Sequence, residues 1–339
     1  MRKARGFPIC AQIGQAVYFW FTLGSGGWFT VLSYYKTVDN KVTALSAPEE
    51  GCWICAIAPS EPEIENLTRR LGVDAGFVRA ALDEEEASRI EREEDQTLII
   101  VDLPIAQKEE EKTIIYSTVP MGIIITEKNI ITVCLSENSV VSELSRGLVK
   151  NVRTQMKTQF LLVLLLRIAT RFLQYLKQID KISDYSEKQL HKTMRNKELI
   201  QLLGLEKSLV YFSTSLKSNE VTLEKIHRGR IIKLYEDDEE LLEDVLIEIR
   251  QAVEMCGIYT NILSNTMDAF SSIINNNLNI VMKILTSLTV LMAIPTMISG
   301  IWGMNVHNLP SVNFWFPIAL AAGLTLLAAL ILWIKGMFK

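Results

Sequence analysis

The chain has 339 residues, of which 49% are hydrophobic and 22% are charged, and its formal net charge is −4. The length fits about two domains, and a positive mean hydropathy combined with many charges fits a large soluble part joined to a few membrane spans. Binding to nucleic acid requires a concentrated basic surface, and the sequence contains no cluster of basic residues. We therefore expect no nucleic-acid partner.

The first 33 residues differ in composition from the rest of the chain. Arg2, Lys3 and Arg5 precede an uncharged, aromatic-rich stretch from 6 to 35 that several glycines interrupt. A signal peptide or a third membrane span has this composition. A cleaved signal would place free thiols outside the cell, and a third span would conflict with the topology of the C-terminus. We therefore expect residues 1–33 to be an extension outside the fold.

Residues 34–138 are expected to form a mixed α/β domain in the cytoplasm. Helical stretches at 61–71 and 74–82 lie between extended segments, and β-rich runs follow them. These runs are 97–103, 113–119, 123–126 and 130–135.

The cysteines are scattered along the chain and odd in number: Cys10, Cys52, Cys55, Cys134 and Cys256. Cys52 and Cys55 form a CxxC, but no second pair or nearby histidine completes a zinc site. Residues three apart in an extended segment also point to opposite faces. We expect ordinary buried thiols in a reducing, cytoplasmic compartment.

Residues 139–278 are expected to form a helical stalk, because this region lacks proline and repeats apolar residues at three- and four-residue spacing. A helix that begins near Asp238 and continues to Trp302 would be on the order of 95 Å long. Such a helix needs partner subunits to cover it. The apolar run 160–166 is too short to cross a membrane and is expected to be a buried helical segment.

Two C-terminal stretches, 284–306 and 314–334, contain no charged residue, and each is long enough to cross a hydrocarbon layer of roughly 30 Å. The connecting loop lacks Lys and Arg, whereas lysines flank the outer ends of the pair. The positive-inside rule therefore places the loop outside and both termini in the cytoplasm. The expected segments are a first span at 279–303, an external loop at 304–313, a second span at 314–334 and a basic tail at 335–339.

One face of the first span is small or polar. Its residues are Asn279, Met282, Thr286, Thr289, Ala293, Thr296, Gly300 and Gly303. Polar groups in a membrane helix are costly unless they face protein or water. Two interpretations are open: a seam where helices pack closely, and a pore wall where identical helices stack rings of hydroxyl, amide and carbonyl groups.

The tripeptide Gly303-Met304-Asn305 closes this span at the outer surface and favours the pore wall. Glycine lets the chain turn there, and Asn305, repeated in each subunit, would present a neutral ring of carboxamide oxygens. Such a ring suits Mg²⁺, which holds its waters tightly, and it binds weakly enough to release the ion.

The run 298–305, Ile-Ser-Gly-Ile-Trp-Gly-Met-Asn, with Pro295-Thr296 upstream, resembles the signature of the CorA family of magnesium transporters. The resemblance extends over roughly residues 34–339. It implies a funnel-shaped homopentamer in which cytoplasmic α/β domains and long stalk helices surround a pore lined by the first span.

The resemblance also implies individual roles for residues of this span. Gly303, Met304 and Asn305 would form the outer selectivity ring, where Asn305 would meet hydrated Mg²⁺. Thr296 matches a pore threonine, Leu285 and Met282 match a hydrophobic constriction, and Asn279 matches a polar ring at the cytoplasmic end. The sequence departs from the family at Ala293, where some members carry methionine, and in the external loop, which lacks the acidic residue of many members.

Two acidic runs occur in the soluble part, Asp83-Glu84-Glu85-Glu86 and the stretch 236–248. A solvated surface is one interpretation; a divalent-cation site that relieves like-charge repulsion is the other. The resemblance implies a pore closed by Mg²⁺ bound between a stalk carboxylate and an acid of the neighbouring subunit. Asp244 matches the stalk position, but Ala80 occupies the partner position, so we hypothesise that Asp83 or Glu84 of the next subunit substitutes for it.

These patterns predict a divalent-cation channel or transporter of the cell membrane, most consistent with Mg²⁺, driven by the membrane potential and gated by internal Mg²⁺. No organic cofactor is expected, and no nucleotide-binding or hydrolytic motif indicates an enzyme. Two alternatives stay open: a transporter of Zn²⁺, Co²⁺ or Ni²⁺ in the same superfamily, and a membrane-anchored helical scaffold or sensor without a pore.

Overall fold

The computed structural model describes residues 31–108, 114–193, 196–229, 231–304 and 315–337. The chain divides into two units, Met1–Leu263 and Ser264–Lys339. Helix α6 (Glu236–Trp302) continues from the first unit into the second. Most of the extension predicted at 1–33 and nearly all of the external loop predicted at 304–313 lie outside the described residues.

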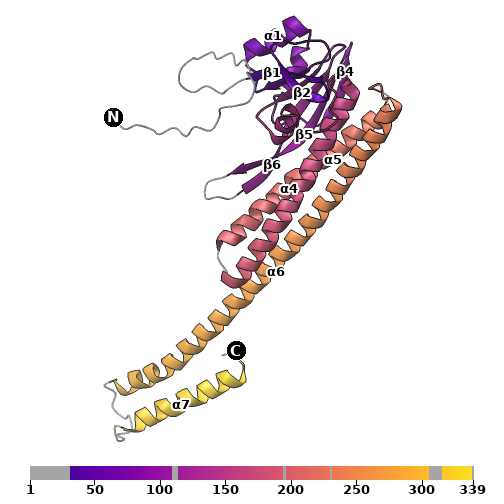
Figure 1. Ribbon diagram of the computed structural model, residues 1–339. Helices are drawn as coiled ribbons and strands as arrows, with labels where there is room; N and C mark the ends of the chain where they lie inside the picture. Colours follow the sequence, from indigo (N-terminus) through magenta and orange to yellow (C-terminus); the bar gives the residue numbers. More distant parts are fainter. Residues whose placement is uncertain (1–30, 109–113, 194–195, 230, 305–314, 338–339) are drawn as a thin grey trace, which may run out of the picture. The chain divides into compact units, whose positions relative to one another are not determined.

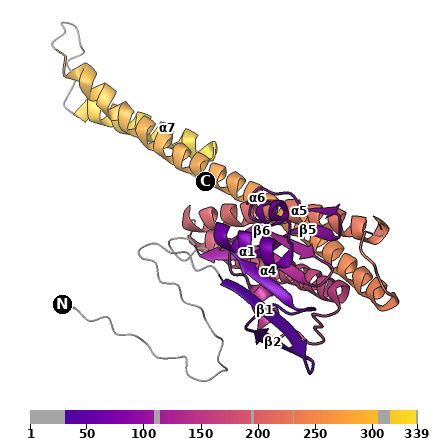
Figure 2. The ribbon, with the colours of Figure 1, turned by 90° about the horizontal axis from the view of Figure 1, so that it is seen from above.

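The first unit contains a seven-stranded sheet in the order β2-β1-β3-β7-β6-β5-β4. All neighbouring strands are antiparallel except the central pair β3 and β7. Figure 2 shows β1 and β2 together at one side of this unit. The strands are β1 (Val31–Val38), β2 (Lys41–Leu45), β3 (Trp53–Ile57), β4 (Arg89–Glu93), β5 (Gln96–Lys108), β6 (Ile114–Ile125) and β7 (Ile130–Cys134).

Residues 114–119 and 123–125 of the two predicted runs belong to a single strand, β6, rather than to two. Pro120 lies in its middle and is paired with Asp102 of β5. The pairing of β6 with β7 begins only at Met121, so Pro120 lies where the strand has β5 as its paired neighbour. A proline is tolerated in a strand where its missing N–H removes no ladder bond.

Helices α1 (Glu61–Leu71) and α2 (Ala75–Ala80) pack against one face of the sheet (Figure 1). Ser60 and Glu63 form a capping box at the start of α1, which satisfies N–H groups that the first helical turn leaves free. The core on this side combines strand and helix residues that are all buried: Ile54, Ile100, Ile124, Val133, Ile64, Leu67 and Phe77.

A second core, which is rich in aromatic residues, joins the sheet to α4 (Lys157–Thr193) and α5 (Asn196–Gly229). Helix α3 (Ser139–Ser145) lies beside α4. Trp53 lies 5.2 Å from Phe160 between ring centroids, and its indole N–H donates to the hydroxyl of Thr132. Phe212 of α5 contacts both Phe172 of α4 and Tyr116 of β6.

Three helices in the described part of the chain are long and apolar enough to cross a membrane: α4, α6 and α7 (Trp315–Ile334). In the most apolar window of α4, 56% of residues are buried inside the protein, against 11% in α6 and 0% in α7. The prediction that 160–166 is a buried helical segment is therefore confirmed. The long helix predicted from near Asp238 to Trp302 is confirmed as α6, and the described cysteines are buried free thiols, as expected.

A test of the sheet–helix packing is Gly122→Ala. A Cβ atom at this β6 position would lie 2.2 Å from the Cβ atom of Ala81, which cannot rotate away, so we expect a loss of about 1–3 kcal/mol in the free energy of unfolding. The measurement is thermal unfolding of the full chain in detergent. Gly204→Ala in α5 is the matched control, because nothing lies within 4 Å of the added atom. A variant Gly122→Ala as stable as the control would contradict this packing.

Candidate functional site

The small and polar stripe of α6 is exposed along its whole length. Every residue from Asn279 to Gly303 that belongs to the predicted stripe is exposed in the single chain. The buried and half-buried residues of the same segment lie on another side of the helix: Ile280, Ser287, Leu291, Ile294, Pro295, Ile298 and Trp302. Gly303 lines the cavity between α6 and α7, and the rest of the stripe lies away from this contact.

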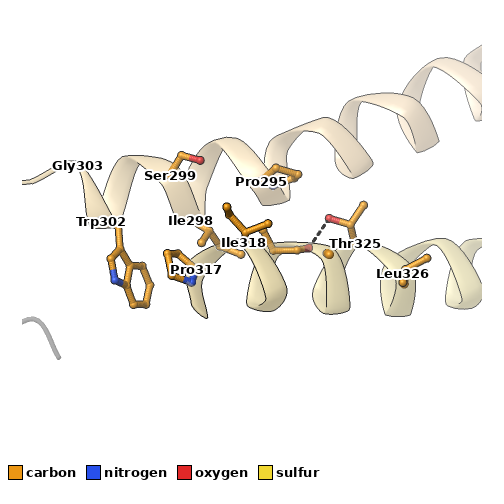
Figure 3. A pocket seen from close by; sticks show the side chains of 11 residues that line it. Pro295, Ile298, Ser299, Trp302, Gly303, Pro317, Ile318, Thr325 and Leu326 are labelled. Carbon is orange, nitrogen blue, oxygen red and sulfur yellow. Dashed lines mark hydrogen bonds between the residues drawn. The ribbon is translucent and has the colours of Figure 1, made fainter. Parts of the chain in front are cut away.

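The contact with α7 is apolar. Trp302 lies 6.2 Å from Phe316 between ring centroids, and Figure 3 shows Ile298 and Trp302 on the side of α6 that faces α7. A cavity of about 990 Å³ lies here, lined by Pro295, Ile298, Ser299, Trp302, Gly303, Pro317, Ile318, Ala321, Ala322, Thr325 and Leu326. No charged residue lines it, and the hydroxyl of Thr325 already donates to the carbonyl of Ala321. This cavity therefore offers no carboxylate to a divalent cation.

Two threonines show what the stripe presents to its surroundings. The hydroxyl of Thr289 donates to the carbonyl of Leu285 at 2.8 Å, and the hydroxyl of Thr296 donates to that of Met292 at 2.9 Å. Each hydroxyl proton is therefore used within the helix. The oxygen lone pairs that remain are acceptors, suited to a cation or to the protons of its bound waters.

Helix α6 ends at the predicted tripeptide. The N–H of Gly303 donates to the carbonyl of Ser299 at 2.9 Å, and that of Met304 donates to Ile301. A Cβ atom at Gly303 would lie 3.2 Å from the Ser299 carbonyl oxygen, so this last turn is tight. Asn305 lies outside the described residues, and its place in an outer ring stays a prediction.

The predicted constriction and the inner ring belong to the same exposed surface. Leu285 and Met282 are more than half exposed, and Asn279 is also exposed one turn before Met282. A surface of this composition along a membrane-length helix requires a further covering, which the described residues of one chain do not provide.

The predicted regulatory residues Asp83, Glu84 and Asp244 are all exposed. The Asp83 carboxylate accepts the backbone N–H of Glu85 at 3.0 Å, which orders the loop. Glu86 forms an ion pair with Arg89 at the end of the same loop. The part of one chain that the structure describes brings no three His, Cys, Asp or Glu residues together as a metal site. A bridge from Asp244 to this loop concerns two subunits and stays a prediction.

A buried polar cluster next to this loop escaped the sequence analysis. Asn219 of α5 is 2% exposed. Its Oδ1 accepts from the Ser88 hydroxyl and from the Asp102 backbone N–H, each at 2.9 Å, and its Nδ2 donates to the Asp102 carbonyl at 2.8 Å. Burial raises the pKa of the Asp102 carboxyl, opposed by hydrogen bonds from Ser215 and Ser88. The sequence pattern that indicates this cluster is the spacing of polar residues on α5, which places four of them on one buried face: Ser208, Ser215, Asn219 and Thr222.

Known proteins are similar to this chain in sequence and in fold. A curated relative, the cobalt/magnesium transport protein CorA of Methanocaldococcus jannaschii, is 28% identical over 279 residues, which are 79% of this chain and 85% of the relative. The CorA of Thermotoga maritima is 32% identical over 129 residues, 34% of this chain and 37% of that protein.

Solved structures extend the likeness to the whole fold. The complete structure of the CorA magnesium transporter of M. jannaschii has a TM-score of 0.74 and 25% identity and covers 91% of this chain and 98% of its own. The full-length CmaX protein shares the fold, with a TM-score of 0.67 and 16% identity over 91% of this chain and 98% of its own. A family model described as "CorA-like Mg2+ transporter protein" matches residues 48–335. The chain therefore belongs to the CorA-like family of Mg²⁺ transporters, which are membrane transporters and not enzymes.

Proposed function

We propose that this chain is the subunit of a Mg²⁺ channel in which the polar stripe of α6 lines the ion pathway. The observation that carries the proposal is the exposure of the stripe from Asn279 to Gly300, which does not line the cavity between α6 and α7. Polar groups on a membrane helix need a partner other than lipid. Identical helices arranged around an axis would give each stripe that partner, in the form of water and ions.

The assembly that we propose is a homopentamer, as the family resemblance implies, in the cell membrane with both termini in the cytoplasm. In this arrangement α6 forms the inner ring and α7 contacts the lipid. All described residues of α7 are exposed or half-exposed in the single chain, which supports a lipid environment for this helix. Leu285 and Met282 would form an apolar constriction, which can gate a pore by excluding water.

Mg²⁺ is the ion that best fits this surface. It is small, prefers oxygen and dehydrates reluctantly, so recognition through its waters suits the hydroxyl acceptors of Thr289 and Thr296 and an Asn305 ring. Within the stripe, Met282 carries the sole sulfur and no histidine occurs. Softer ions favour nitrogen and sulfur ligands.

Transport of Co²⁺ is the alternative that a specific observation supports, because both curated relatives are named cobalt/magnesium transport proteins. A Zn²⁺ or Ni²⁺ transporter has less support, because Met282 is the one soft ligand in the stripe. A non-conducting scaffold leaves the exposed stripe unexplained. Competition between Mg²⁺ and Co²⁺ during uptake distinguishes the first two ions.

The driving force that we propose is the membrane potential. An inside-negative potential of 100 mV favours entry of a divalent cation by about 4.6 kcal/mol, twice the value for a single charge. No nucleotide-binding motif in the sequence offers another source of energy.

Replacement of a stripe hydroxyl tests the pore wall. We expect Thr296→Val to lower Mg²⁺ flux into proteoliposomes about fivefold or more, because each subunit loses one acceptor and a hydrogen bond contributes ~1 kcal/mol. Thr325→Val is the matched control: this hydroxyl also donates to the carbonyl four residues earlier, but it lies at the cavity with α7. Equal flux in the two variants, at equal incorporation, would contradict a pore wall at Thr296.

Replacement of the stalk carboxylate tests gating. We propose that internal Mg²⁺ bridges Asp244 to Asp83 or Glu84 of the next subunit and closes the pore. Asp244→Ala should therefore raise the internal Mg²⁺ concentration that half-inhibits uptake by about tenfold, a loss of ~1.4 kcal/mol in the binding of the closing ion. Glu254→Ala, which removes another exposed carboxylate of α6, should leave it unchanged. Inhibition of the Asp244 variant at the wild-type concentration would exclude this site.

A further inference from the structure

We propose that residues 219–224 of α5, here called the coupling turn, link the acidic loop 83–88 to helix α6. Through this link, ion binding at the loop would restrain the pore helix. The inference rests on the proposed regulation by internal Mg²⁺ and adds the residues that transmit it. All the contacts involved lie within the first unit, where Figure 1 and Figure 2 both place α5 beside the first part of α6.

The first contact joins the loop to the coupling turn. Ser88 lies at the end of the acidic loop, next to Arg89, whose side chain holds Glu86 and Glu91. The Ser88 hydroxyl donates to Asn219 Oδ1, and the other two bonds of this carboxamide fix Asn219 to the β5 backbone at Asp102. Asn219 is buried, and a buried amide that loses its partner is destabilised. Displacement of the loop end therefore requires either displacement of α5 or loss of this bond.

The second contact joins the coupling turn to α6. Arg250 reaches two carboxylates of α5, with Nε 3.3 Å from Glu220 Oε1 and Nη2 3.0 Å from Glu224 Oε1. Glu220 and Glu224 are four residues apart and lie on the same side of α5. Two carboxylates that hold one planar guanidinium fix its direction as well as its distance. A rotation of α6, or a shift of α6 along its axis, would therefore move Arg250 away from these two carboxylates of α5.

The second contact lies close along α6 to Asp244, the residue at which we propose that the ion binds. Arg250 follows Asp244 by six residues, on the order of 9 Å along the helix axis. One end of the proposed ion bridge would hold the acidic loop of one subunit and the other end would hold α6 of its neighbour. Within each subunit, the coupling turn joins that loop to that subunit's own α6. Binding of an ion between two subunits thereby restrains both helices.

Spatial continuity alone does not show coupling, because a contact can stabilise the fold without transmitting a signal. The sharpest test uses Arg250→Gln, because Arg250 is about half exposed and its replacement leaves the core intact. Arg228→Gln is the matched control: Arg228 pairs with the same Glu224 but within α5. Both variants lose one positive charge near Glu224, and Arg250→Gln is the one that removes ion pairs between α5 and α6.

The experiment measures Mg²⁺ flux in proteoliposomes as a function of internal Mg²⁺ for the full chain. We expect Arg250→Gln and Ser88→Ala each to raise the half-inhibiting concentration about fivefold, with flux at low internal Mg²⁺ unchanged. The thermal midpoint of Arg250→Gln should equal that of the wild type, because this side chain lies at the surface. Because the contacts act in series, the double variant should shift it no further than either single variant. Arg228→Gln should match the wild type.

Three results would overturn the inference. Wild-type inhibition in both Arg250→Gln and Ser88→Ala, while Asp244→Ala is relieved of inhibition, would leave the proposed function intact and remove the coupling turn from it. Additive shifts in the double variant would show two independent structural effects. Absence of flux or of Mg²⁺ inhibition in the wild type would reject the proposed function itself, and the inference with it.

Discussion

The cost of placing a polar group in hydrocarbon is the constraint on which the C-terminal half of this protein depends. Helix α6 carries hydroxyls, an amide and glycines along one side and branched apolar residues along others. The hydroxyl protons of Thr289 and Thr296 are satisfied inside the helix, but their oxygens are not shielded by α7. A stripe of this kind is stable in a membrane only if it faces other protein or water, and the homo-oligomer that we propose would supply both.

Apolar helical sequence is buried inside the protein in α4 and exposed in α7, and the difference depends on whether a sheet packs against the helix. The run 160–166 of α4 is as apolar as a membrane span, yet it packs against Trp53 and the central strands. Helix α7 packs against no sheet within the described part of the chain, and its tryptophans and all of its leucines except Leu332 are exposed. Membrane insertion is therefore expected where the fold offers no internal surface, and burial where the sheet provides one.

Local patterns were sufficient to predict α1, α6 and α7, because helical spacing and the absence of charge are read from neighbouring residues. They failed at β6, where two separate runs were predicted although the pairing with β5 continues between them through Pro120. They also failed at Asn219, whose partners Ser88 and Asp102 are 131 and 117 residues away in sequence. The exposure of the stripe could be predicted from composition; its position relative to α7 required the fold.

The most direct test of the ion pathway is Mg²⁺ entry into proteoliposomes that contain only the purified chain, under an imposed inside-negative potential. If α6 lines a pore that ends at Asn305, the wild type should carry Mg²⁺ at a rate that increases with the potential, and Asn305→Ala at equal incorporation should reduce that rate at least about tenfold. Flux that is absent in the wild type, or that is unchanged in Asn305→Ala, would contradict a pore formed by this helix.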